Sequence, residues 1–435
     1  MLNERIRKGE RNIENTMKIN GGIPLNGTIK TQGAKNAALP VMAVCLLLRG
    51  QTLTLDNVPD LYDINTMTAL IEDLGVHAEI IRDENKSQVI FHVPDEIKYE
   101  VSENLARKMR GSSLLLGPVL ASCGKVLLPL PGGCSIGARP IDLHLKGLKQ
   151  MGADIEIQNG VVHASVKGRL RGRRIYLDFP SVGATENLMM AASLAQGETI
   201  IENIAREPEI DNLAAALKCI GVPVELEGTG GVRIQGIESC HSGHERVIPD
   251  RIEACTYILA GVMTNGHIRI EDIVPSHIDA ILAKLEEAGA KFSVRRNVIE
   301  IFPSKKRLHP ISVKTMPYPG FPTDSQPQMG AALSIARGVS TIEESVFQAR
   351  FLYAQELNRM GADIQISRDV AIIRGVERLQ GANVKATDLR AGAALIIAGL
   401  SAEGETVVED MVHVWRGYEA IDKKLKALGA QVELI

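Results

Sequence analysis

The chain has few aromatic residues and almost no excess of charge of either sign. Aromatic residues make up 3% of its 435 residues, and 49 Lys and Arg against 52 Asp and Glu give a net charge of −3. Proteins that bind nucleic acid usually carry a basic excess and aromatic side chains that stack on bases. We therefore expect no nucleic-acid partner, although a local cluster of arginines can still bind a small anion.

Cysteine pairs and long apolar runs are also missing. None of the six cysteines stands in a Cys-x-x-Cys pair, which argues against a disulfide framework and against a zinc site. The longest apolar run, Leu39 to Leu48, has about half the length that a membrane-spanning helix needs. Residues 1–16 are charged and contain no apolar signal segment, so we expect a flexible extension there. These features predict a cytoplasmic protein without a membrane partner, disulfides or a metal ion.

What the sequence does contain is a pattern that occurs six times. An apolar residue, a Gly, and apolar residues three and five positions after that Gly recur at intervals of 68 to 77 residues. The glycines are Gly75, Gly152, Gly221, Gly289, Gly361 and Gly429. Apolar residues at helical spacing precede each Gly, as Ile281 and Leu285 precede Gly289, so each Gly is predicted to end a helix in the left-handed conformation. The alternating residues after each Gly predict a strand.

Each repeat also contains an earlier helix that is rich in Ala and apolar around most of its surface, as in residues 186–195 and 389–400. Such a helix is buried, whereas the helix that ends at the repeated Gly is amphipathic and lies outside it. The sequence therefore predicts an α/β fold of two domains, each with three repeated βα units. One open solenoid of six units is the alternative. The segment 247–249 is a candidate crossover between the domains.

Basic residues stand at the starts of several of the buried helices. Lys35, Arg110 and Arg390 oppose the positive end of the helix dipole, and an anionic ligand would explain their position. If the helices of successive repeats point the same way, these residues converge with Thr323 and Asp324 at one end of the fold. Helix dipoles and guanidinium groups would then form an anion site.

Two further sets of polar residues recur in the repeat. Ser181, Asp250 and Asp388 stand at the starts of other buried helices, where capping of the helix explains them at least as well as a ligand does. Three arginines share a later position, between a strand and the second helix of the repeat. They are Arg139, Arg350 and Arg416. Their shared position favours a functional role, although each could also be solvated or paired with a Glu.

The segment from Leu130 to Pro140 carries three glycines and one thiol, Cys134, followed by Arg139. Pro140 suits the first turn of a helix, so Arg139 stands where a helix N-terminus favours an anion. A thiol beside an arginine and a helix start can have a lowered pKa and react as a nucleophile or an acid. A small structural residue in a Gly-rich turn is the simpler explanation of the same pattern.

Four stretches together resemble one known family. They are Gly33-Ala34-Lys35-Asn36-Ala37, the segment 131–140, Phe321-Pro322-Thr323-Asp324 and Ala386-Thr387-Asp388-Leu389-Arg390. In these residues the chain resembles the UDP-N-acetylglucosamine enolpyruvyl transferases, from about Met17 to the C-terminus. The resemblance implies an inside-out α/β barrel of two domains with the active site in the cleft between them. It implies one domain of residues 1–34 and 249–435, and a second domain of residues 35–248 that carries the Cys134 loop.

The resemblance also implies a reaction. The enolpyruvyl group of phosphoenolpyruvate passes to the 3′-hydroxyl of UDP-N-acetylglucosamine, and phosphate is released. Phosphoenolpyruvate carries a phosphate and a carboxylate, which explains a need for several fixed cations. Addition requires a proton delivered to the methylene carbon and another removed from the sugar hydroxyl. No cofactor is implied.

The site residues follow from positions that match the family's motifs. The catalytic matches are Cys134 as general acid, Asp324 as a candidate base, and Lys35. The matches to phosphoenolpyruvate contacts are Lys35, Asn36, Arg139, Arg390 and Arg416. The matches to UDP-N-acetylglucosamine contacts are Asn36, Arg110, Arg139, Pro140, Ile141, Asp142, Leu143, Asp324 and Val346. The further polar matches are Arg350 and Asp388.

Two alternatives remain open at this point. The sister family, which transfers enolpyruvyl to shikimate 3-phosphate, has the same fold but lacks the Cys of the Pro-Gly-Gly loop, so Cys134 argues against it. A non-catalytic UDP-sugar sensor would need the binding residues without the acid, and the chain keeps both Cys134 and Asp324. The sequence departs from the family at Leu114, where a Trp is frequent, and at Phe179-Pro180, where a basic residue is frequent. Both departures concern the UDP end of the site.

Overall fold

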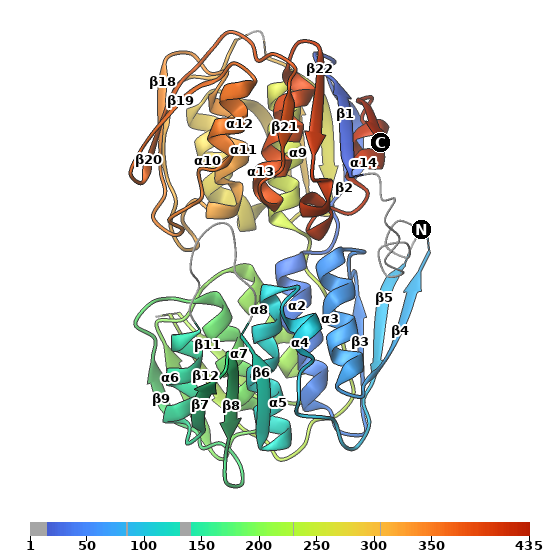
Figure 1. Cartoon of the computed structure of the whole chain (residues 1–435), viewed down its shortest axis with the longest axis vertical. Coiled ribbons are helices and arrows are strands. Elements are labelled where there is room, and N and C mark those ends of the chain that lie inside the picture. The colour runs from blue at the N-terminus through green and yellow to red at the C-terminus, as the bar shows by residue number, and fades with distance from the viewer. Residues whose placement is uncertain (1–14, 84–85, 131–140, 229, 305) are drawn as a thin grey trace. The chain divides into compact units, whose positions relative to one another are not determined.

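The computed structural model describes residues 15–83, 86–130, 141–228, 230–304 and 306–435, and these residues form two compact units (Figure 1). The C-terminal unit contains residues 15–32 and 249–435, and the N-terminal unit contains the described residues from 33 to 248. Each unit has its own hydrophobic core. The alternative of one open solenoid is therefore wrong, and the two-domain α/β prediction is confirmed.

The described part of the C-terminal unit contains three four-stranded sheets. The first has the order β21 (Asn383–Lys385), β22 (Glu405–Glu409), β1 (Thr16–Asn20), β23 (Gln431–Leu434). The second has the order β15 (Lys291–Arg295), β16 (Val298–Phe302), β14 (His267–Glu271), β2 (Asn26–Lys30). The third has the order β17 (Ser312–Lys314), β18 (Val339–Glu343), β20 (Val370–Arg374), β19 (Asp363–Ser367).

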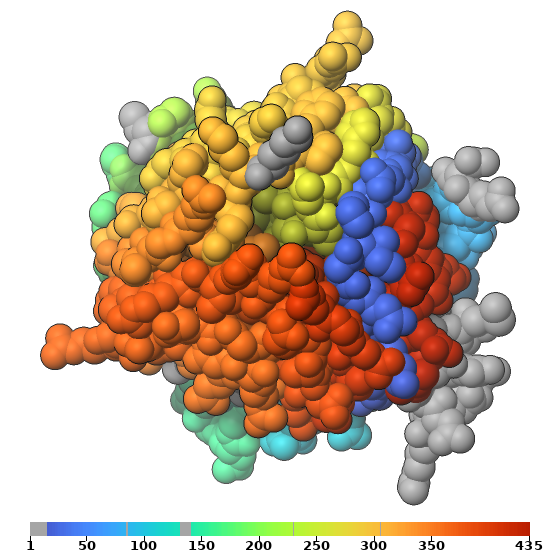
Figure 2. All heavy atoms as spheres, turned by 90° about the horizontal axis from the view of Figure 1, so that it is seen from above, coloured from blue at the N-terminus to red at the C-terminus, as the bar shows by residue number. Residues whose placement is uncertain are grey.

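The N-terminal segment completes two of these sheets. β1 pairs antiparallel with both β22 and β23, and β2 pairs in parallel with β14. Met17 and Ile19 of β1 point into the core and are fully buried, as the alternation of a half-buried strand requires. In the space-filling view, the blue N-terminal segment runs across the surface of this unit between yellow and red parts of the chain (Figure 2).

The described part of the N-terminal unit repeats this arrangement. One sheet has the order β13 (Gly243–Arg246), β3 (Thr52–Asp56), β5 (Ser87–His92), β4 (His77–Arg82). Another has the order β11 (Val224–Glu227), β12 (Gly231–Gln235), β10 (Glu198–Glu202), β9 (Arg174–Tyr176). The third has the order β6 (Lys125–Pro129), β8 (Val161–Ser165), β7 (Asp154–Gln158), and an isolated parallel bridge from Glu100 to Leu127 takes the place of its fourth strand.

Each sheet packs on a buried inner helix and an outer helix. The inner helices are α2 (Lys35–Ala43), α5 (Leu116–Cys123), α7 (Val182–Ser193), α9 (Arg251–Met263), α11 (Gln326–Leu333) and α13 (Leu389–Ser401). The outer helices are α3 (Tyr62–Asp73), α6 (Asp142–Gln150), α8 (Pro208–Cys219), α10 (Asp279–Glu287), α12 (Tyr353–Arg359) and α14 (Ile421–Ala427). Shorter elements are α4 (Glu103–Ala106), η1 (Val44–Leu47), η2 (Arg110–Leu115), η3 (Pro275–Ile278), η4 (Thr323–Ser325) and η5 (Met411–Arg416). All eight residues of α11 are buried, as the apolar pattern of the inner helices predicts.

The six repeated glycines end the six outer helices, as the sequence predicts. Each lies two residues beyond the last helical residue, with φ between 80° and 103°. At Gly75, the N–H donates to the carbonyl of Glu72, and the N–H of Val76 donates back to Ile71. A residue with a Cβ is strained at this φ, so Gly is the residue that lets the chain leave the helix and enter the next strand.

Four of the inner helices, α2, α7, α9 and α13, begin where the sequence predicts, and α5 and α11 begin later. Ser181, Asp250 and Asp388 accept hydrogen bonds from the first backbone amides of α7, α9 and α13 and are helix caps. Arg110 and Thr323 instead open the 3₁₀ turns η2 and η4, which lead directly into α5 and α11. The tighter 3₁₀ turn changes the direction in which the first side chains of these two helices project.

Candidate active site

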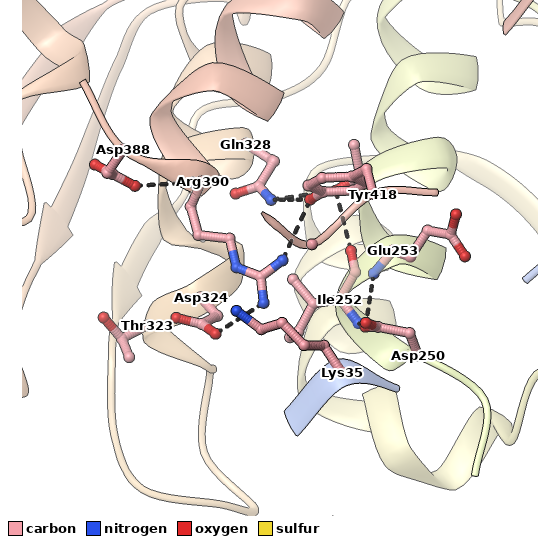
Figure 3. A network of polar contacts seen from close by, with 12 residues as sticks. Lys35, Asp250, Ile252, Glu253, Thr323, Asp324, Gln328, Asp388, Arg390 and Tyr418 are labelled. Carbon is pink, nitrogen blue, oxygen red and sulfur yellow. Dashed lines mark hydrogen bonds and ion pairs between the residues drawn. The ribbon is translucent and has the colours of Figure 1, made fainter. Parts of the chain in front are cut away.

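In the C-terminal unit, one carboxylate is held between two arginines. Asp324 Oδ1 accepts from Arg350 Nη2 at 2.7 Å. Asp324 Oδ2 accepts from Arg390 Nη2 at 3.0 Å (Figure 3). Asp324 lies on η4 before α11, and Arg390 lies in the first turn of α13. These residues meet because α11 and α13 pack against each other with their N-termini at the same end. Arg350 reaches the carboxylate from the segment between β18 and α12, and its Nε donates to the Thr323 carbonyl at 3.2 Å.

The three side chains differ in exposure. Those of Arg350 and Arg390 are 2% and 5% exposed, whereas that of Asp324 is 26% exposed. Burial by itself would lower the pKa of Arg390, but Asp324, Tyr418 and Asp250 together outweigh this effect and raise the pKa, so Arg390 stays charged. The arrangement presents a partly open carboxylate whose position is set by two buried cations.

A second layer of polar groups supports Arg390. Its Nη1 donates to the hydroxyl of Tyr418 at 3.5 Å, and its guanidinium lies 5.9 Å from the centre of the Tyr418 ring. The Tyr418 hydroxyl lies 2.7 Å from Thr256 Oγ1 and accepts from Gln328 Nε2 at 3.2 Å (Figure 3). Burial raises the pKa of Tyr418, so this hydroxyl stays protonated at neutral pH. Arg390 is thus fixed at both ends of its guanidinium group.

Asp388 acts as the cap of α13. Its Oδ1 accepts from the backbone amides of Arg390 at 2.8 Å and Ala391 at 3.1 Å. The sequence left open whether this residue is a cap or a ligand-binding group, and the structure shows the cap. The same hydrogen bonds place Arg390 in the first helical turn, so the cap also orients the arginine.

Val346 and Arg416 lie on separate segments of the same unit. The Val346 N–H donates to Glu344 Oε1 at 2.8 Å, so a substrate contact at Val346 would use its carbonyl or its side chain. Arg416 is the last residue of η5. The next carbonyl, that of Gly417, accepts from the Gln32 side chain at 2.9 Å, which fixes the backbone beside Arg416.

In the N-terminal unit, Lys35 forms an ion pair with Asp63. Lys35 Nζ lies 3.2 Å from Asp63 Oδ2, and their side chains are 12% and 3% exposed. Lys35 is the first residue of α2, and Asp63 lies in the first turn of α3. Asn36, the next residue of α2, is exposed. A lysine at a helix N-terminus opposes the helix dipole, and the buried carboxylate of Asp63 offsets that cost.

Arg110 lies near a buried histidine of the same unit. Burial and then the charge of Arg110 lower the pKa of His144 to about 4, against a smaller opposite effect of Asp142. His144 Nδ1 lies 2.9 Å from the amide nitrogen of Asn187, which donates to it. His144 therefore stays neutral at physiological pH. Asp142 and Leu143 begin the same helix, α6, after the buried Ile141.

Cys134, Arg139 and Pro140 lie outside the described residues. The other five cysteines are described, and all are free thiols. Burial raises the pKa of each of them, to about 11 for Cys219 and Cys240 and to about 12 for Cys255. The described thiols are therefore poor nucleophiles at neutral pH.

The described residues contain neither a metal cluster nor a membrane-spanning helix. Within the described ranges, no group of three His, Cys, Asp or Glu side chains is arranged to hold a metal ion. No helix in this same part of the chain is both long enough and apolar enough to cross a bilayer.

The sequence did not identify several residues that hold the candidate groups. Asp63, His144, Glu344 and Tyr418 are partners of Lys35, Arg110, Val346 and Arg390. Asp63, His144 and Tyr418 each lie at least 28 residues from their partners, whereas Glu344 lies two residues from Val346. No motif marks them, and burial of their polar atoms is a signal that only a structure can supply.

Comparisons with known proteins define the family to which this chain belongs. The sequence model of the EPSP synthase (3-phosphoshikimate 1-carboxyvinyltransferase) family matches residues 19–425, so the chain belongs to this family of carboxyvinyltransferases. Two solved structures share the fold. The enolpyruvyl transferase NikO from Streptomyces tendae has a TM-score of 0.87 at 24% identity, with 96% of this chain and 98% of that chain covered. EPSP synthase from Acinetobacter baumannii has a TM-score of 0.75 at 18% identity, with 96% and 99% covered.

More similar relatives carry a narrower name. The chain is 48% identical over 410 residues to UDP-N-acetylglucosamine 1-carboxyvinyltransferase 1 of Caldanaerobacter subterraneus, covering 94% of this chain and 97% of that protein. It is 49% identical over 416 residues to UDP-N-acetylglucosamine 1-carboxyvinyltransferase of Shewanella woodyi, covering 96% and 98%. The resemblance drawn from the sequence motifs is thereby confirmed.

Proposed function

We propose that this protein transfers the enolpyruvyl group of phosphoenolpyruvate to the 3′-hydroxyl of UDP-N-acetylglucosamine and releases phosphate. One observation carries the proposal. In a chain 48% to 49% identical to proteins named for this transfer, the buried guanidinium groups of Arg350 and Arg390 hold the partly open carboxylate of Asp324. An ionised carboxylate is an acceptor only, so it can bind the sugar hydroxyl and take its proton.

The reaction has two steps, an addition and an elimination. In the addition, the sugar oxygen bonds to C2 of phosphoenolpyruvate, the hydroxyl proton leaves to a base, and an acid protonates the C3 methylene. In the elimination, the C2–O bond to phosphate breaks, and C3 loses a proton to restore the double bond. We assign Asp324 as the base for the hydroxyl and Cys134 as the acid for C3.

The remaining candidates bind and orient the two substrates. We assign the phosphate and carboxylate of phosphoenolpyruvate to Lys35, Asn36, Arg139, Arg390 and Arg416. We assign the UDP-sugar to Asn36, Arg110, Arg139, Pro140, Ile141, Asp142, Leu143, Asp324 and Val346. The fixed ammonium group of Lys35 and the fixed guanidinium group of Arg390 support this assignment, because preorganised cations stabilise the negative charge of the departing phosphate.

This transfer is the first committed step of peptidoglycan synthesis, and its product enters that synthesis. We place the reaction in the cytoplasm. No cofactor takes part in the proposed chemistry.

The experiment is release of phosphate from phosphoenolpyruvate with UDP-N-acetylglucosamine or shikimate 3-phosphate as the acceptor. We expect release with the UDP-sugar only. Release with the shikimate acceptor only would reassign the protein to the sister activity. Tight UDP-sugar binding without release would instead make it a sensor.

A further inference from the structure

Glu344 is a buried carboxylate that the proposed chemistry does not use. It follows β18, and the residue is 5% exposed. Its Oε1 accepts from Thr315 Oγ1 at 2.8 Å, from the Val346 N–H at 2.8 Å and from the Phe347 N–H at 3.1 Å. Its Oε2 accepts from Thr323 Oγ1 at 2.9 Å. The four donors that the described residues supply to Glu344 are two hydroxyls and two backbone amides, and none of the four is a Lys or an Arg side chain.

Burial of a carboxylate is costly unless each oxygen is well hydrogen-bonded. The four donors come from three separate segments, which are the end of β17, the η4 turn and the start of the loop that follows β18. The loop bonds are local, because Val346 and Phe347 lie two and three residues beyond Glu344. The Thr323 bond is long-range and reaches the residue directly before Asp324.

The loop that follows β18 runs from Glu344 to Arg350, and residues at both of its ends bind the Thr323–Asp324 turn. At its start, Glu344 binds the Thr323 hydroxyl at 2.9 Å. At its end, Arg350 donates to the Thr323 carbonyl at 3.2 Å and to the Asp324 carboxylate at 2.7 Å. Phe347 connects the two ends, since its amide binds Glu344 and its ring lies 5.9 Å from the Arg350 guanidinium. A shift of the loop would therefore move both the base and the arginine that faces it.

We propose that Glu344 is a positioning residue that sets the place of Asp324 through the Thr323 hydroxyl and of Arg350 through the Val346–Phe347 backbone. This inference rests on the proposed function, because it assigns Glu344 to the geometry of the base. Glu344 does not touch the reacting atoms. A carboxylate suits the role because it can accept four hydrogen bonds and donates none, whereas an amide of the same size must present two N–H groups.

The test is a double-mutant cycle of Glu344→Gln and Thr323→Val in the full-length chain. In Glu344→Gln, the amide oxygen can still serve the loop amides, but its NH₂ group then faces the Thr323 hydroxyl. We expect each single change to lower kcat for UDP-N-acetylglucosamine about tenfold while the KM for phosphoenolpyruvate stays within about twofold. The double variant should be no slower than the slower single variant, because both changes remove the same donation from the Thr323 hydroxyl to Glu344.

Matched controls lie next to these residues. Glu343→Gln removes an exposed carboxylate that pairs with Lys314 at 2.6 Å, and Thr341→Val removes an exposed hydroxyl bonded to Ser312 at 2.9 Å. Both controls should keep wild-type kcat. Fully additive losses in the double variant would overturn the link through Thr323. A lower melting temperature with unchanged kcat in Glu344→Gln would reduce Glu344 to a stabilising role.

A second measurement separates this inference from the proposed function. Hydrogen exchange of the unliganded protein should be faster in Glu344→Gln than in Glu343→Gln at residues 323–324 and 345–350. If the wild type releases no phosphate with the UDP-sugar, the proposed function fails, and exchange alone then decides whether Glu344 holds these segments. Unchanged exchange in both segments would overturn the inference whatever the activity.

Discussion

Arg350 and Asp324 form an ion pair of 2.7 Å in which the arginine side chain is 2% exposed and the carboxylate is 26% exposed. The buried partner cannot swing away, because its Nε is also bonded to the Thr323 carbonyl. The more exposed Asp324 carboxylate can contact a ligand while Arg350 keeps it in position. This asymmetry is what a positioned acceptor for a sugar hydroxyl requires.

Replacement of Asp324 tests the proposed base. Asp324→Asn keeps the size of the side chain but removes the negative charge that faces Arg350 and Arg390. We expect kcat to fall by about 10²- to 10⁴-fold. The free energy of unfolding should also fall by about 1–3 kcal/mol, because two buried cations lose their counter-charge. Phosphate release and urea unfolding measure the two effects.

The control for this prediction is Asp363→Asn. Asp363 pairs with Arg374 at 3.5 Å, and both side chains are 47% exposed. Exposed pairs contribute about 0–1 kcal/mol, so neither activity nor stability should change measurably. An Asp324→Asn variant that keeps wild-type kcat would contradict the assignment of the base.

Asp63 is expected to control phosphoenolpyruvate binding through Lys35. Two effects of Asp63→Asn oppose each other, since loss of a negative charge favours an anion and loss of a partner frees the lysine. We expect the second effect to dominate, because the lysine side chain is long and flexible. Asp63, which is 3% exposed, is the buried acceptor that fixes the ammonium group of Lys35. The KM for phosphoenolpyruvate should rise about tenfold, as steady-state kinetics will show.

Asp73→Asn is the matched control for Asp63→Asn, because Asp73 lies at the exposed end of the same helix, α3. It should leave both KM values unchanged. A lower KM for phosphoenolpyruvate in Asp63→Asn would mean that Asp63 competes with the substrate for Lys35.

Cys134 is the expected target of a thiol-alkylating epoxide such as fosfomycin. Burial raises the pKa of all five described cysteines, so they should react slowly at neutral pH. Cys134→Ala should bind UDP-N-acetylglucosamine and lose turnover. Cys134→Asp should keep an acid, remain active and resist the epoxide. Mass spectrometry and residual activity measure the outcome.

Cys240→Ala serves as the control for the thiol. It should be inactivated by the epoxide as the wild type is, because burial raises the pKa of Cys240 to about 11. Inactivation of Cys134→Asp at the wild-type rate would place the reactive group elsewhere.

His144 should make stability depend on pH between about 4 and 6.5. Its pKa of about 4 lies below the ordinary value of 6.5, so the unfolded chain binds the extra proton first. Stability from the neutral ring is present above pH 6.5 and is lost as the pH falls toward 4, by about 3 kcal/mol in total. Urea unfolding gives the free energy of unfolding of the wild type and of His144→Gln at each pH in this range. The difference between the two free energies isolates the contribution of His144.

The difference between wild type and His144→Gln should shrink as the pH falls. A constant difference for His144→Gln would show that the ring does not titrate below its usual range.

The repeat architecture could be predicted because its signals are local. A Gly such as Gly289, with φ of 80°, follows apolar residues at helical spacing, and both facts depend only on neighbouring residues. The same holds for Asp250, whose carboxylate caps amides two and three residues ahead. The starts of four inner helices followed from these patterns, and with them the positions of Lys35 and Arg390, whereas Arg110 opens the 3₁₀ turn η2 ahead of α5.

The partners of these residues could not be predicted in the same way. Asp324 and Arg390 are 66 residues apart, and Arg390 meets Tyr418, which in turn binds Gln328, through packing of separate segments. Glu344 and Asp63 carry no motif, and in the sequence each is indistinguishable from a solvated acid. Their importance comes from burial and from donors that other segments bring.

Sequence alone determined the six α/β repeats, the helix ends and, through shared motifs, the family and its candidate site residues. Only the tertiary structure decided that Asp388 is a cap, that Asp324 lies between two buried arginines, and that Glu344 holds the turn beside it. Helix capping and periodicity act within a few residues of the chain, whereas the pairing of buried charges depends on which distant segments pack together.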